Sequence, residues 1–436
     1  AHAFSAFLPS GFESAAIVTA DGHGEDDCTN LWVGEGGDLR RLAQWQLPAS
    51  LGWVYTKFTQ HFGFYAHDGE GKLMGLAAYG RPVPDLLDRV ARVYRPTGDD
   101  QIYAVDPAFF LGEGPYTRAW LDLFGPGRAL ESGEPFSQER MDLAFAVQDT
   151  LERIGTALAE RVLALSGKAR LCVAGGTFMN CKLNGVLAAR VGHGNFFTQP
   201  AAGDNGISIG AALAVHRALG GGPVEAPLSR FDFGPAFAPA RIEAALREEG
   251  LVFRKLPDIE QETARLLAAS KVVGWFQGRM EGGARALGHR SILANPLDPE
   301  MSGVVNRKVK FREPWRPFCP SVTEEEGETY FDYQGKLPFM IVACRAREGV
   351  KQRMPSVVHV DGTVRVQTVS RAMDPRFHLL LTEFKALTGT PVLLNTSFNV
   401  KGEPIICTPE EAIACFRKTA LDALVLEDYL VTKGAV

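Results

Sequence analysis

Polar side chains that could do chemistry gather near the end of the sequence, between Pro391 and Phe416. The apolar stretch 391–394 predicts a buried strand, and a polar turn follows it at 395–399. Thr408 and Glu411 then fit the N-cap and the third position of a predicted helix. An ordinary strand-to-helix connection has the same pattern. Amides and hydroxyls at the end of a strand are, however, also how α/β proteins bind ligands.

A second segment, from Arg279 to Arg316, is rich in positive charge. It contains eight cations and four anions, a surplus of four (8 − 4), inside a chain whose formal net charge is −5. Glycine, tryptophan, phenylalanine and proline separate the charges, so we expect a folded, partly enclosed segment. Phosphate or acyl phosphate fits the fork of an enclosed guanidinium, and a solvated surface of ion pairs is the alternative. The cations are Arg279, Arg285, Arg290, Arg307, Lys308, Lys310, Arg312 and Arg316.

Two strand-to-turn transitions in the N-terminal half suit a metal or a phosphate. The predicted strand 15–20 ends in Asp21, and the predicted strand 169–174 ends in Gly175-Gly176 before a helix. Two glycines let the backbone approach a phosphate with its N–H groups exposed. Asp204 lies between Gly203 and Asn205-Gly206, a turn that frees its carboxylate. Each aspartate could equally be a structural residue at a strand end.

These residues need an α/β framework to position them. Apolar spacing predicts helices over 50–64, 142–165 and 206–219, helical structure within 242–267, and a strand over 271–276. The Gly/Pro-rich stretch 220–235 is typical of a domain boundary. A length of 436 residues allows two or three domains. We therefore predict two, 1–235 and 236–436.

The composition restricts the class of protein. The sequence contains no apolar run long enough to span a membrane and no segment like a signal peptide. Seven scattered cysteines without a CxxC pair predict reduced thiols in a cytoplasmic protein, and no zinc site. A pI near 6.1 argues against nucleic acid as a partner. The cysteines are Cys28, Cys172, Cys181, Cys319, Cys344, Cys407 and Cys415.

Taken together, the motifs resemble those of the NodU/CmcH/TobZ family of O-carbamoyltransferases. Besides the two segments above, the resemblance covers SLGWVYTKFTQHFGFYAHDGEGKLMGLAAYG (50–80), LCVAGGTFMNCKLNG (171–185) and QPAAGDNGISIGAA (199–212). It runs in one order through nearly the whole chain. It implies an actin/sugar-kinase-like (ASKHA) domain over 1–235 and a YrdC-like α/β domain over 236–436.

The first residues match only the end of a family pattern, HHxSHAASAF. His2 therefore looks like the second histidine of an HxxxH metal pair, and part of the first lobe is expected to be missing. Either the chain is a fragment or that lobe is supplied from elsewhere. The resemblance implies that His2, Asp21 and Asp204 bind a divalent metal, Fe(II), Mn or Mg, which polarises the intermediate or the acceptor hydroxyl.

The resemblance also implies the reaction. Carbamate derived from carbamoyl phosphate attacks ATP, giving carbamoyl-adenylate and pyrophosphate, and the carbamoyl group then moves to a hydroxyl of a natural product or sugar. The acceptor would lie among loops of 81–135. In the YrdC-like domain Arg285, Lys310, Arg316 and Arg365 would neutralise phosphate charge, Asn395 and Ser397 would bind the carbamoyl amide and the adenylate, and Arg312 and Asn399 would extend the nucleotide contacts.

The actin-like domain has its own predicted nucleotide contacts, from Gly175, Gly176 and Asn180. Glu70 and Lys72 could serve the same site or form a surface ion pair. Three histidines, His23, His61 and His67, are interpreted as hydrogen-bonded turn residues rather than ligands.

Two other functions stay open. One is a different enzyme of the same superfold, a threonylcarbamoyl-adenosine synthase acting on tRNA or a hydrogenase-maturation carbamoyltransferase. The former should be basic, and the latter should contain an acylphosphatase segment and paired CxxC motifs. The other is a catalytically impaired paralogue that only binds nucleotide or a partner. A small hydroxylated acceptor is the expected partner, without nucleic acid or membrane, and a homodimer stays open.

Overall fold

The structure, a computed structural model, describes residues 1–111, 115–222, 224 and 227–433. Its chain forms two compact units, Ala1–Leu228 and Ser229–Val436. The division precedes the expected boundary at 235/236 because Phe231 and Gly234 already exchange backbone hydrogen bonds with 280–282. Residues 223 and 225–226 of the expected linker, and 112–114 of the expected acceptor segment, lie outside the described residues.

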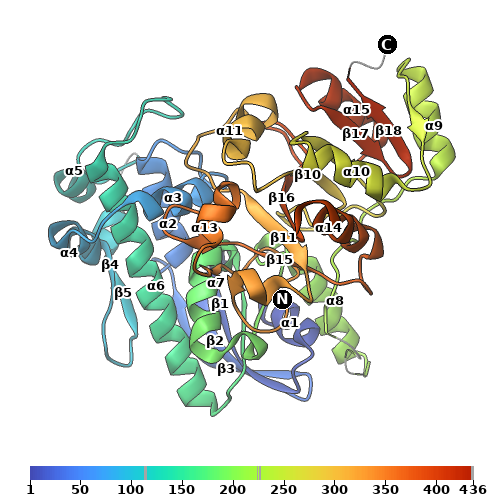
Figure 1. The fold of residues 1–436 in the computed structure, drawn as a ribbon. Helices are drawn as coiled ribbons and strands as arrows, with labels where there is room; N and C mark the ends of the chain where they lie inside the picture. The colour runs from blue at the N-terminus through green and yellow to red at the C-terminus, as the bar shows by residue number, and fades with distance from the viewer. Residues whose placement is uncertain (112–114, 223, 225–226, 434–436) are drawn as a thin grey trace. The chain divides into compact units, whose positions relative to one another are not determined.

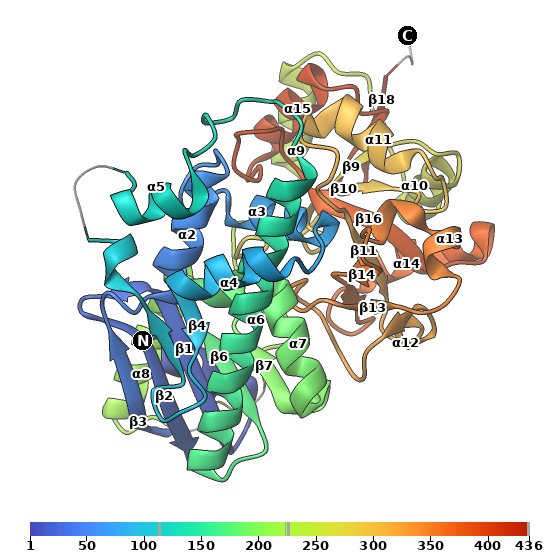
Figure 2. The ribbon, with the colours of Figure 1, turned by 90° about the vertical axis from the view of Figure 1, so that its left-hand side faces the viewer.

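The first unit is built on a five-stranded sheet in the order β3-β2-β1-β6-β7 (Figures 1 and 2). The pairs β1–β6 and β6–β7 are parallel, whereas β1–β2 and β2–β3 are antiparallel. One face packs on α1 and α8 through a core that includes Phe7, Ile17 and Cys172, and the long helix α6 packs beside β1 and β2. The end of β1 therefore lies in a layered, mixed α/β structure.

The elements of the first unit follow the apolar spacing of the sequence. The strands are β1 (Ser14–Gly24), β2 (Asp27–Glu35), β3 (Asp38–Gln46), β4 (Tyr94–Pro96), β5 (Tyr103–Val105), β6 (Leu171–Ala174) and β7 (Phe196–Thr198). The helices are α1 (His2–Phe7), α2 (Leu51–His61), α3 (Glu70–Leu76), α4 (Pro84–Val93), α5 (Arg118–Phe124), α6 (Gln138–Ser166), α7 (Cys181–Val191) and α8 (Ile207–Ala218).

The second unit is built on an eight-stranded mixed sheet in the order β15-β11-β16-β10-β9-β17-β18-β8. Helices α10 and α14 cover one face of it through a core that includes Trp275, Leu293, Phe377, Leu393 and Val425. Helix α15 contacts β9 and β17. A three-stranded sheet, β12-β13-β14, completes the unit.

In the second unit the strand predicted over 271–276 is observed as β9, and the helix predicted after Thr408 as α15. The strands are β8 (Arg254–Lys255), β9 (Val273–Phe276), β10 (Arg290–Ala294), β11 (Cys319–Thr323), β12 (Phe331–Asp332), β13 (Cys344–Ala346), β14 (Thr363–Val364), β15 (Gln367–Val369), β16 (Val392–Ser397), β17 (Ala423–Leu426) and β18 (Tyr429–Thr432). The helices are α9 (Pro239–Glu248), α10 (Ile259–Ala268), α11 (Met301–Val305), α12 (Gly327–Tyr330), α13 (Val350–Arg353), α14 (Pro375–Thr388) and α15 (Pro409–Lys418).

Two predicted elements differ from the structure. Helical structure within 242–267 is interrupted, because Gly250 adopts a φ of +61° after α9 and the chain then forms β8. The polar turn expected at 395–399 begins later, because Asn395, Thr396 and Ser397 belong to β16. That strand lies between β10 and β11 and is antiparallel to both.

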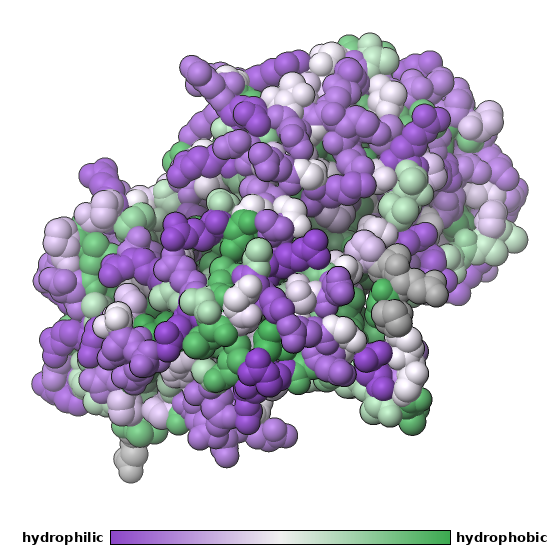
Figure 3. Space-filling model, turned by 90° about the horizontal axis from the view of Figure 1, so that it is seen from below, coloured by the Kyte–Doolittle hydropathy of each residue, from purple (hydrophilic) through white to green (hydrophobic). Residues whose placement is uncertain are grey.

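None of the helices in the described residues is long and apolar enough to cross a membrane. The face drawn in Figure 3 is mostly hydrophilic, with hydrophobic patches interspersed. All seven cysteines are free thiols, and all but Cys407 are buried, as the sequence predicted.

Candidate functional site

Three side chains of the first unit converge where the buried part of β1 ends. His2 opens α1, Asp21 lies on β1, and Asp204 begins the turn before α8. His2 Nε2 lies 2.7 Å from Asp21 Oδ2 and 3.7 Å from Asp204 Oδ1, and one ligand atom of each residue lies within 4.8 Å of the others. One imidazole and two carboxylates form a donor set that suits Fe(II), Mn²⁺ or a similar divalent ion. The structure thus brings the three expected metal ligands together.

The electrostatics of this group leave room for a cation. Burial pushes the pKa of Asp21 upward, but hydrogen bonds from His2 and from the amides of Gly22 and Gly176 outweigh it, and the pKa lies below its ordinary value. Burial, and then repulsion by Asp21, raise the pKa of Asp204. Two carboxylates therefore face one imidazole, and a bound divalent ion would relieve the repulsion between them.

The double glycine holds this group in place. Gly175 has a φ of +104°, and a Cβ there would lie 2.1 Å from the carbonyl oxygen of Ala20. A Cβ on Gly176 would lie 2.7 Å from Asp21 Oδ1, to which the Gly176 amide donates at 3.1 Å. Both glycines are needed because the turn approaches the end of β1 so closely. The phosphate contact expected of them stays a prediction.

The other nucleotide contacts expected in the first unit lie in local polar networks. Asn180 caps α7 by accepting from the Leu183 amide at 3.0 Å, and its side-chain amide exchanges hydrogen bonds with that of Gln148 at 2.9 and 3.1 Å. A ligand contact of Asn180 therefore also stays a prediction.

Glu70 and Lys72 do not pair with each other as a surface ion pair. Glu70 Oε1 accepts from Thr56 Oγ1 at 2.8 Å and from the His67 amide at 2.9 Å. The buried Lys72 instead bridges to Glu131 at 2.8 Å. Residues i and i+2 lie on different sides of a helix, which explains why α3 separates them.

In the second unit, Lys310 and the end of β16 form one hydrogen-bonded group. Lys310 closes a π-helical turn, 306–310, that continues α11; such turns are frequent at functional sites. Its Nζ donates to the carbonyl and Oγ of Ser397 at 2.6 and 3.0 Å, and to the carbonyl and Oδ1 of Asn399 at 3.2 and 2.6 Å. Burial, and then the charges of Arg312 and Arg316, hold the pKa of Lys310 well below its ordinary value.

Three arginines extend this positive group. Burial, followed by the charge of Arg316, lowers the pKa of Arg312 to about 9, and Arg365 contributes to the same shift. Arg312 donates to Asn306 Oδ1 at 3.4 Å and stacks over Phe318 at 4.4 Å. The Arg316 guanidinium lies 3.7 Å from Glu313. Burial is the main cause of the lowered pKa values of Lys310 and Arg312, and the neighbouring arginines add to it.

Asn395 lies next to this group on the same face of the sheet as Ser397, because strand side chains alternate. It pairs in register with Cys319, whose Sγ accepts from Arg365 at 3.0 and 3.2 Å. Its Nδ2 donates to Ser321 Oγ at 3.0 Å and to Gln367 Oε1 at 3.2 Å. The buried Oδ1 of Asn395 has no hydrogen-bond partner within the described part of the chain.

Arg285 lies in the loop between β9 and β10, beside Ala286. The carbonyl oxygen of Ala286 is 3.5 Å from Asn395 Nδ2. Arg312, Arg316 and Arg365 thus lie near the hydrogen-bonded group of Lys310, Ser397 and Asn399, and Asn395 pairs with Cys319 beside Arg365. A contact of Arg285 with the same site stays a prediction.

The environment of Arg290 differs from what its charge predicted. The sequence suggested that every enclosed guanidinium in this segment needs an anionic partner, and for Arg290 this is wrong. The fully buried guanidinium lies over the Phe276 ring at 3.5 Å, and burial lowers its pKa to about 10. It donates at 3.0–3.3 Å to the backbone carbonyls of Pro235, Gln277, Gly278, His289 and Cys407.

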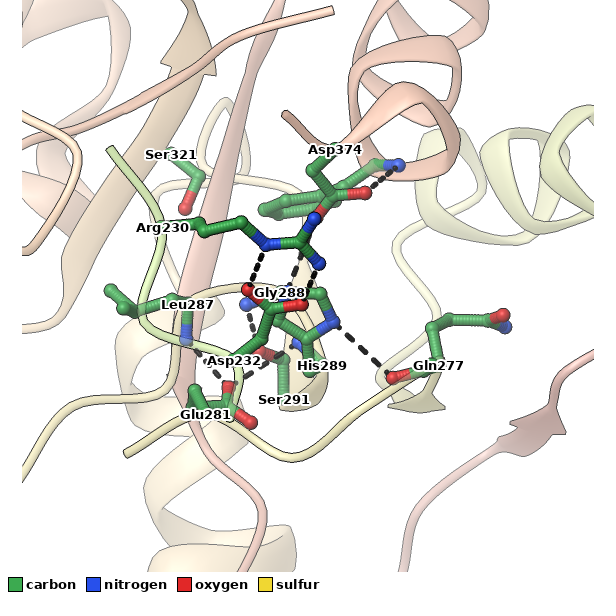
Figure 4. Close-up of polar contacts among 12 residues, drawn as sticks. Arg230, Asp232, Gln277, Glu281, Leu287, Gly288, His289, Ser291, Ser321 and Asp374 are labelled. Atoms are coloured by element: carbon green, nitrogen blue, oxygen red, sulfur yellow. Dashed lines mark hydrogen bonds and ion pairs between the residues drawn. The ribbon is translucent and has the colours of Figure 1, made fainter. Parts of the chain in front are cut away.

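One carboxylate that the sequence analysis missed organises the loop of Arg285. Glu281 Oε1 accepts from the amides of Leu287, His289 and Arg290 at 2.7, 3.3 and 3.1 Å (Figure 4). A buried acid in a Gly-rich loop is the signal that could have found it, because such loops leave amides without partners.

Further acidic groups lie beside this loop. Asp374 caps α14 through the Phe377 amide at 3.0 Å and lies 3.8 Å from His289, while Asp232 pairs with Arg230 (Figure 4). Burial raises the pKa of Asp374 against the attraction of His289.

Comparisons with known proteins agree with this arrangement of two units. The family model described as Carbamoyltransferase N-terminus matches residues 1–213, and that described as Carbamoyltransferase C-terminus matches 264–433. The protein sll1178 of Synechocystis is 40% identical, over 100% of this chain and 75% of that protein. Nodulation protein NolO of Bradyrhizobium diazoefficiens is 38% identical, over 99% of this chain and 78% of that protein.

Other matches are partial. Nodulation protein NolNO of Sinorhizobium fredii is 38% identical over 99% of this chain, which spans 63% of that protein. A crystal structure of full-length HypF in the phosphate- and nucleotide-bound form aligns with 40% of this chain and 25% of that chain, at 19% identity and a TM-score of 0.28. That score is too low to support an argument about fold.

Proposed function

The chain belongs to the carbamoyltransferase family, and we propose that it is an ATP-dependent O-carbamoyltransferase. In this proposal the second unit, YrdC-like, forms carbamoyl-adenylate from ATP and carbamoyl phosphate. The first unit, actin-like, transfers the carbamoyl group to a hydroxyl of a small molecule such as a sugar or natural product. The relatives named nodulation proteins are consistent with a small-molecule acceptor.

The observation that carries the proposal is the positive group around Lys310. In the proposed first step, water cleaves carbamoyl phosphate to carbamate and phosphate, and a carbamate oxygen then attacks the α-phosphorus of ATP while pyrophosphate leaves. Lys310, Arg312, Arg316 and Arg365 would offset the charge that collects on the phosphoryl oxygens. Because these cations are already fixed and partly desolvated, their stabilisation needs no reorganisation during the reaction.

Asn395 would orient the carbamoyl part of the adenylate, and Arg285 would add to the cations that neutralise phosphate charge. The Oδ1 atom of Asn395, which has no partner within the described residues, can accept a hydrogen bond from the carbamoyl amino group. Glu281 would keep the Arg285 loop in its shape by holding three of its amides.

In the first unit, His2, Asp21 and Asp204 would hold a divalent metal. A bound ion of this kind acts as a Lewis acid on a carbonyl or hydroxyl oxygen. The chain's own contribution is to fix the carboxylate of Asp21 through the amides of Gly22 and Gly176, so that its oxygens stay in position. In the transfer step the acceptor oxygen bonds to the carbamoyl carbon, AMP leaves, and the hydroxyl proton is released.

Pyrophosphate exchange tests the proposed activation step. The full chain is incubated with ATP, Mg²⁺, labelled pyrophosphate and carbamoyl phosphate, and label entering ATP is counted. We expect exchange that depends on carbamoyl phosphate. Exchange that is absent, or that proceeds equally well without carbamoyl phosphate, would overturn the proposal and favour a paralogue that only binds nucleotide. Mass spectrometry of hydroxylated candidates after incubation then identifies the acceptor by the added carbamoyl group.

A further inference from the structure

Three cations of the first unit lie away from the His2 group, and two of them, Lys57 and Arg128, face aromatic rings. The three cations are Lys57 on α2, Arg128 in the loop after α5, and Arg140 on the first turn of α6. Lys57 Nζ lies 5.3 Å from the centre of the Tyr116 ring and 5.8 Å from that of Trp120. Within the described residues, no carboxylate or hydrogen-bond acceptor pairs with Lys57, although burial lowers its pKa.

The two arginines are also incompletely satisfied. The Nη1 atoms of Arg128 and Arg140 are buried and have no hydrogen-bond partner in the part of the chain that the structure describes. Arg128 is held in place by Ser132 Oγ at 2.8 Å and by the ring of Phe136 at 4.0 Å. Burial lowers the pKa of Arg128, and the charge of Arg140 adds to this while that of Glu134 opposes it. The Arg128 amide donates to the carbonyl of His61 at 2.9 Å, so this loop lies beside the end of α2.

Aromatic side chains that pack on one another form a rigid wall beside Lys57. Tyr116 stacks on Trp120 at 5.9 Å with an angle of 24° between the rings. Trp120 is fully buried and donates to His61 Nδ1 at 3.2 Å. Burial, and then the charge of Arg140, lower the pKa of His61 to about 4, so this histidine stays neutral at pH 7 and holds the wall rather than adding charge.

Helix α2 connects this group with the His2 group. At the start of the helix, Ser50 Oγ donates to the carbonyls of Asp21 and Gly22 at 3.1 and 2.5 Å. Trp53, three residues further on, packs against His23 with ring centres 5.2 Å apart. Lys57 follows one turn later on the same side, a rise of about 6 Å along the axis. Figure 2 shows α5, which carries Trp120, beside α2 in this unit.

We propose that Lys57, Arg128 and Arg140 bind a phosphate group on the hydroxylated acceptor, with Tyr116 against its adjoining ring. The assignment of the ligand as the acceptor rests on the proposed function. A phosphomonoester fits better than a carboxylate because it brings about two negative charges and three acceptor oxygens to three cations. The position on α2 lets a phosphate bound there extend its hydroxyl-bearing part toward Asp21.

Covalent labelling of Lys57 tests the site without any ATP turnover. Pyridoxal 5′-phosphate carries a phosphate and an aldehyde on an aromatic ring. Its aldehyde carbon condenses with a neutral lysine Nζ and releases water, and borohydride reduces the C=N bond to a stable amine that peptide mass spectrometry locates. We expect Lys57 to be labelled at least 10-fold faster by pyridoxal 5′-phosphate than by pyridoxal, which lacks the phosphate.

Variants and competitors complete the test. Arg140→Gln should slow the labelling of Lys57 at least 10-fold, whereas Arg118→Gln, an exposed arginine paired with Asp122, should not change it. Glucose 1-phosphate should protect Lys57, and glucose should not. Equal labelling by pyridoxal, no labelling, no effect of Arg140→Gln, or protection by glucuronate but not by glucose 1-phosphate would each overturn the proposal. Because labelling needs no carbamoyl-adenylate, a failed pyrophosphate exchange would count against the proposed function alone.

Discussion

The candidate centres of the two units are built from opposite charges. In the first unit, two carboxylates and one imidazole lie within 4.8 Å of one another, and backbone amides hold Asp21 from behind. In the second unit, cations gather around Lys310, and neutral oxygens of Ser397 and Asn399 hold it. The acidic group suits a resident cation, whereas the basic group suits an anion that arrives and leaves in each cycle. In the proposed function, this contrast corresponds to a transfer centre in the first unit and an activation centre in the second.

The largest expected effect is on the acidic group. In Asp21→Ala, carbamoyl transfer to the acceptor should fall by at least about 100-fold, because a Lewis acid supplies several kcal/mol of stabilisation. Bound divalent metal, measured by elemental analysis of the purified chain, should fall as well. Asp27→Ala removes a carboxylate that pairs with Arg41 at the surface and is the matched control. Unchanged metal content and unchanged transfer would remove the contrast between the two units.

The next effect is on the basic group. Lys310→Ala or Arg365→Ala should slow carbamoyl-phosphate-dependent pyrophosphate exchange by roughly 10- to 150-fold, the equivalent of about 1.5–3 kcal/mol for a lost charge-assisted contact. Lys308→Ala is the control, because Lys308 is two residues away and pairs with Asp422 at 2.7 Å. Exchange at the wild-type rate in both test variants would show that activation takes place elsewhere.

Several features of the first unit could be predicted from short stretches of the sequence. Strand β1 with Asp21 near its end, and the turn that frees Asp204, follow from residues adjacent in the chain. The metal-type group could therefore be predicted from short patterns together with the family resemblance. Helix α15 likewise begins where Thr408 and Glu411 predicted it.

The predictions that were wrong concern residues whose partners come from distant segments of the chain. Asn395 can lie inside a central strand because Ser321 and Gln367, from two other strands, accept hydrogen bonds from its amide. Arg290 needs no anion because carbonyls from several loops surround it. The spacing of apolar residues along the sequence gives no information about such distant partners. The Lys57 group was missed for the same reason, since its three cations come from separate segments.

Lowering the pH from about 6.5 to 4 should destabilise the first unit. The pKa of His61 is about 4 in the folded state and near 6.5 ordinarily, so the unfolded chain binds more protons between these values. The stability due to a neutral His61 is complete above about pH 6.5 and is lost as the pH falls toward 4. From pH 6.5 to 5 the loss is about 2 kcal/mol at 1.36 kcal/mol per pH unit.

Calorimetry at pH 7 and pH 5 measures this loss. His61→Leu should flatten the dependence, whereas His67→Asn, at an exposed position, should preserve it. An identical pH dependence in wild type and His61→Leu would contradict the assignment. Arg312 of the second unit should not contribute in this range, because its lowered pKa, about 9, lies well above it.

The smallest effect concerns the helix that follows the basic group. Thr408 Oγ accepts from the Glu411 amide at 3.2 Å, and Glu411 Oε2 accepts from the amides of Thr408 and Cys407 at 3.1 and 2.6 Å. Thr408→Ala should therefore lower the free energy of unfolding of the second unit by about 1 kcal/mol, measured by urea denaturation, and Thr408→Ser should restore it. Neither residue contacts Lys310 in the hydrogen bonds described above, so pyrophosphate exchange should stay within about 2-fold of wild type below the unfolding transition, far from the loss expected for Lys310→Ala. A 10-fold loss of exchange in Thr408→Ala would mean that the position of α15 sets the geometry of the basic group, and the activation centre would then include the segment from Asn399 to Thr408.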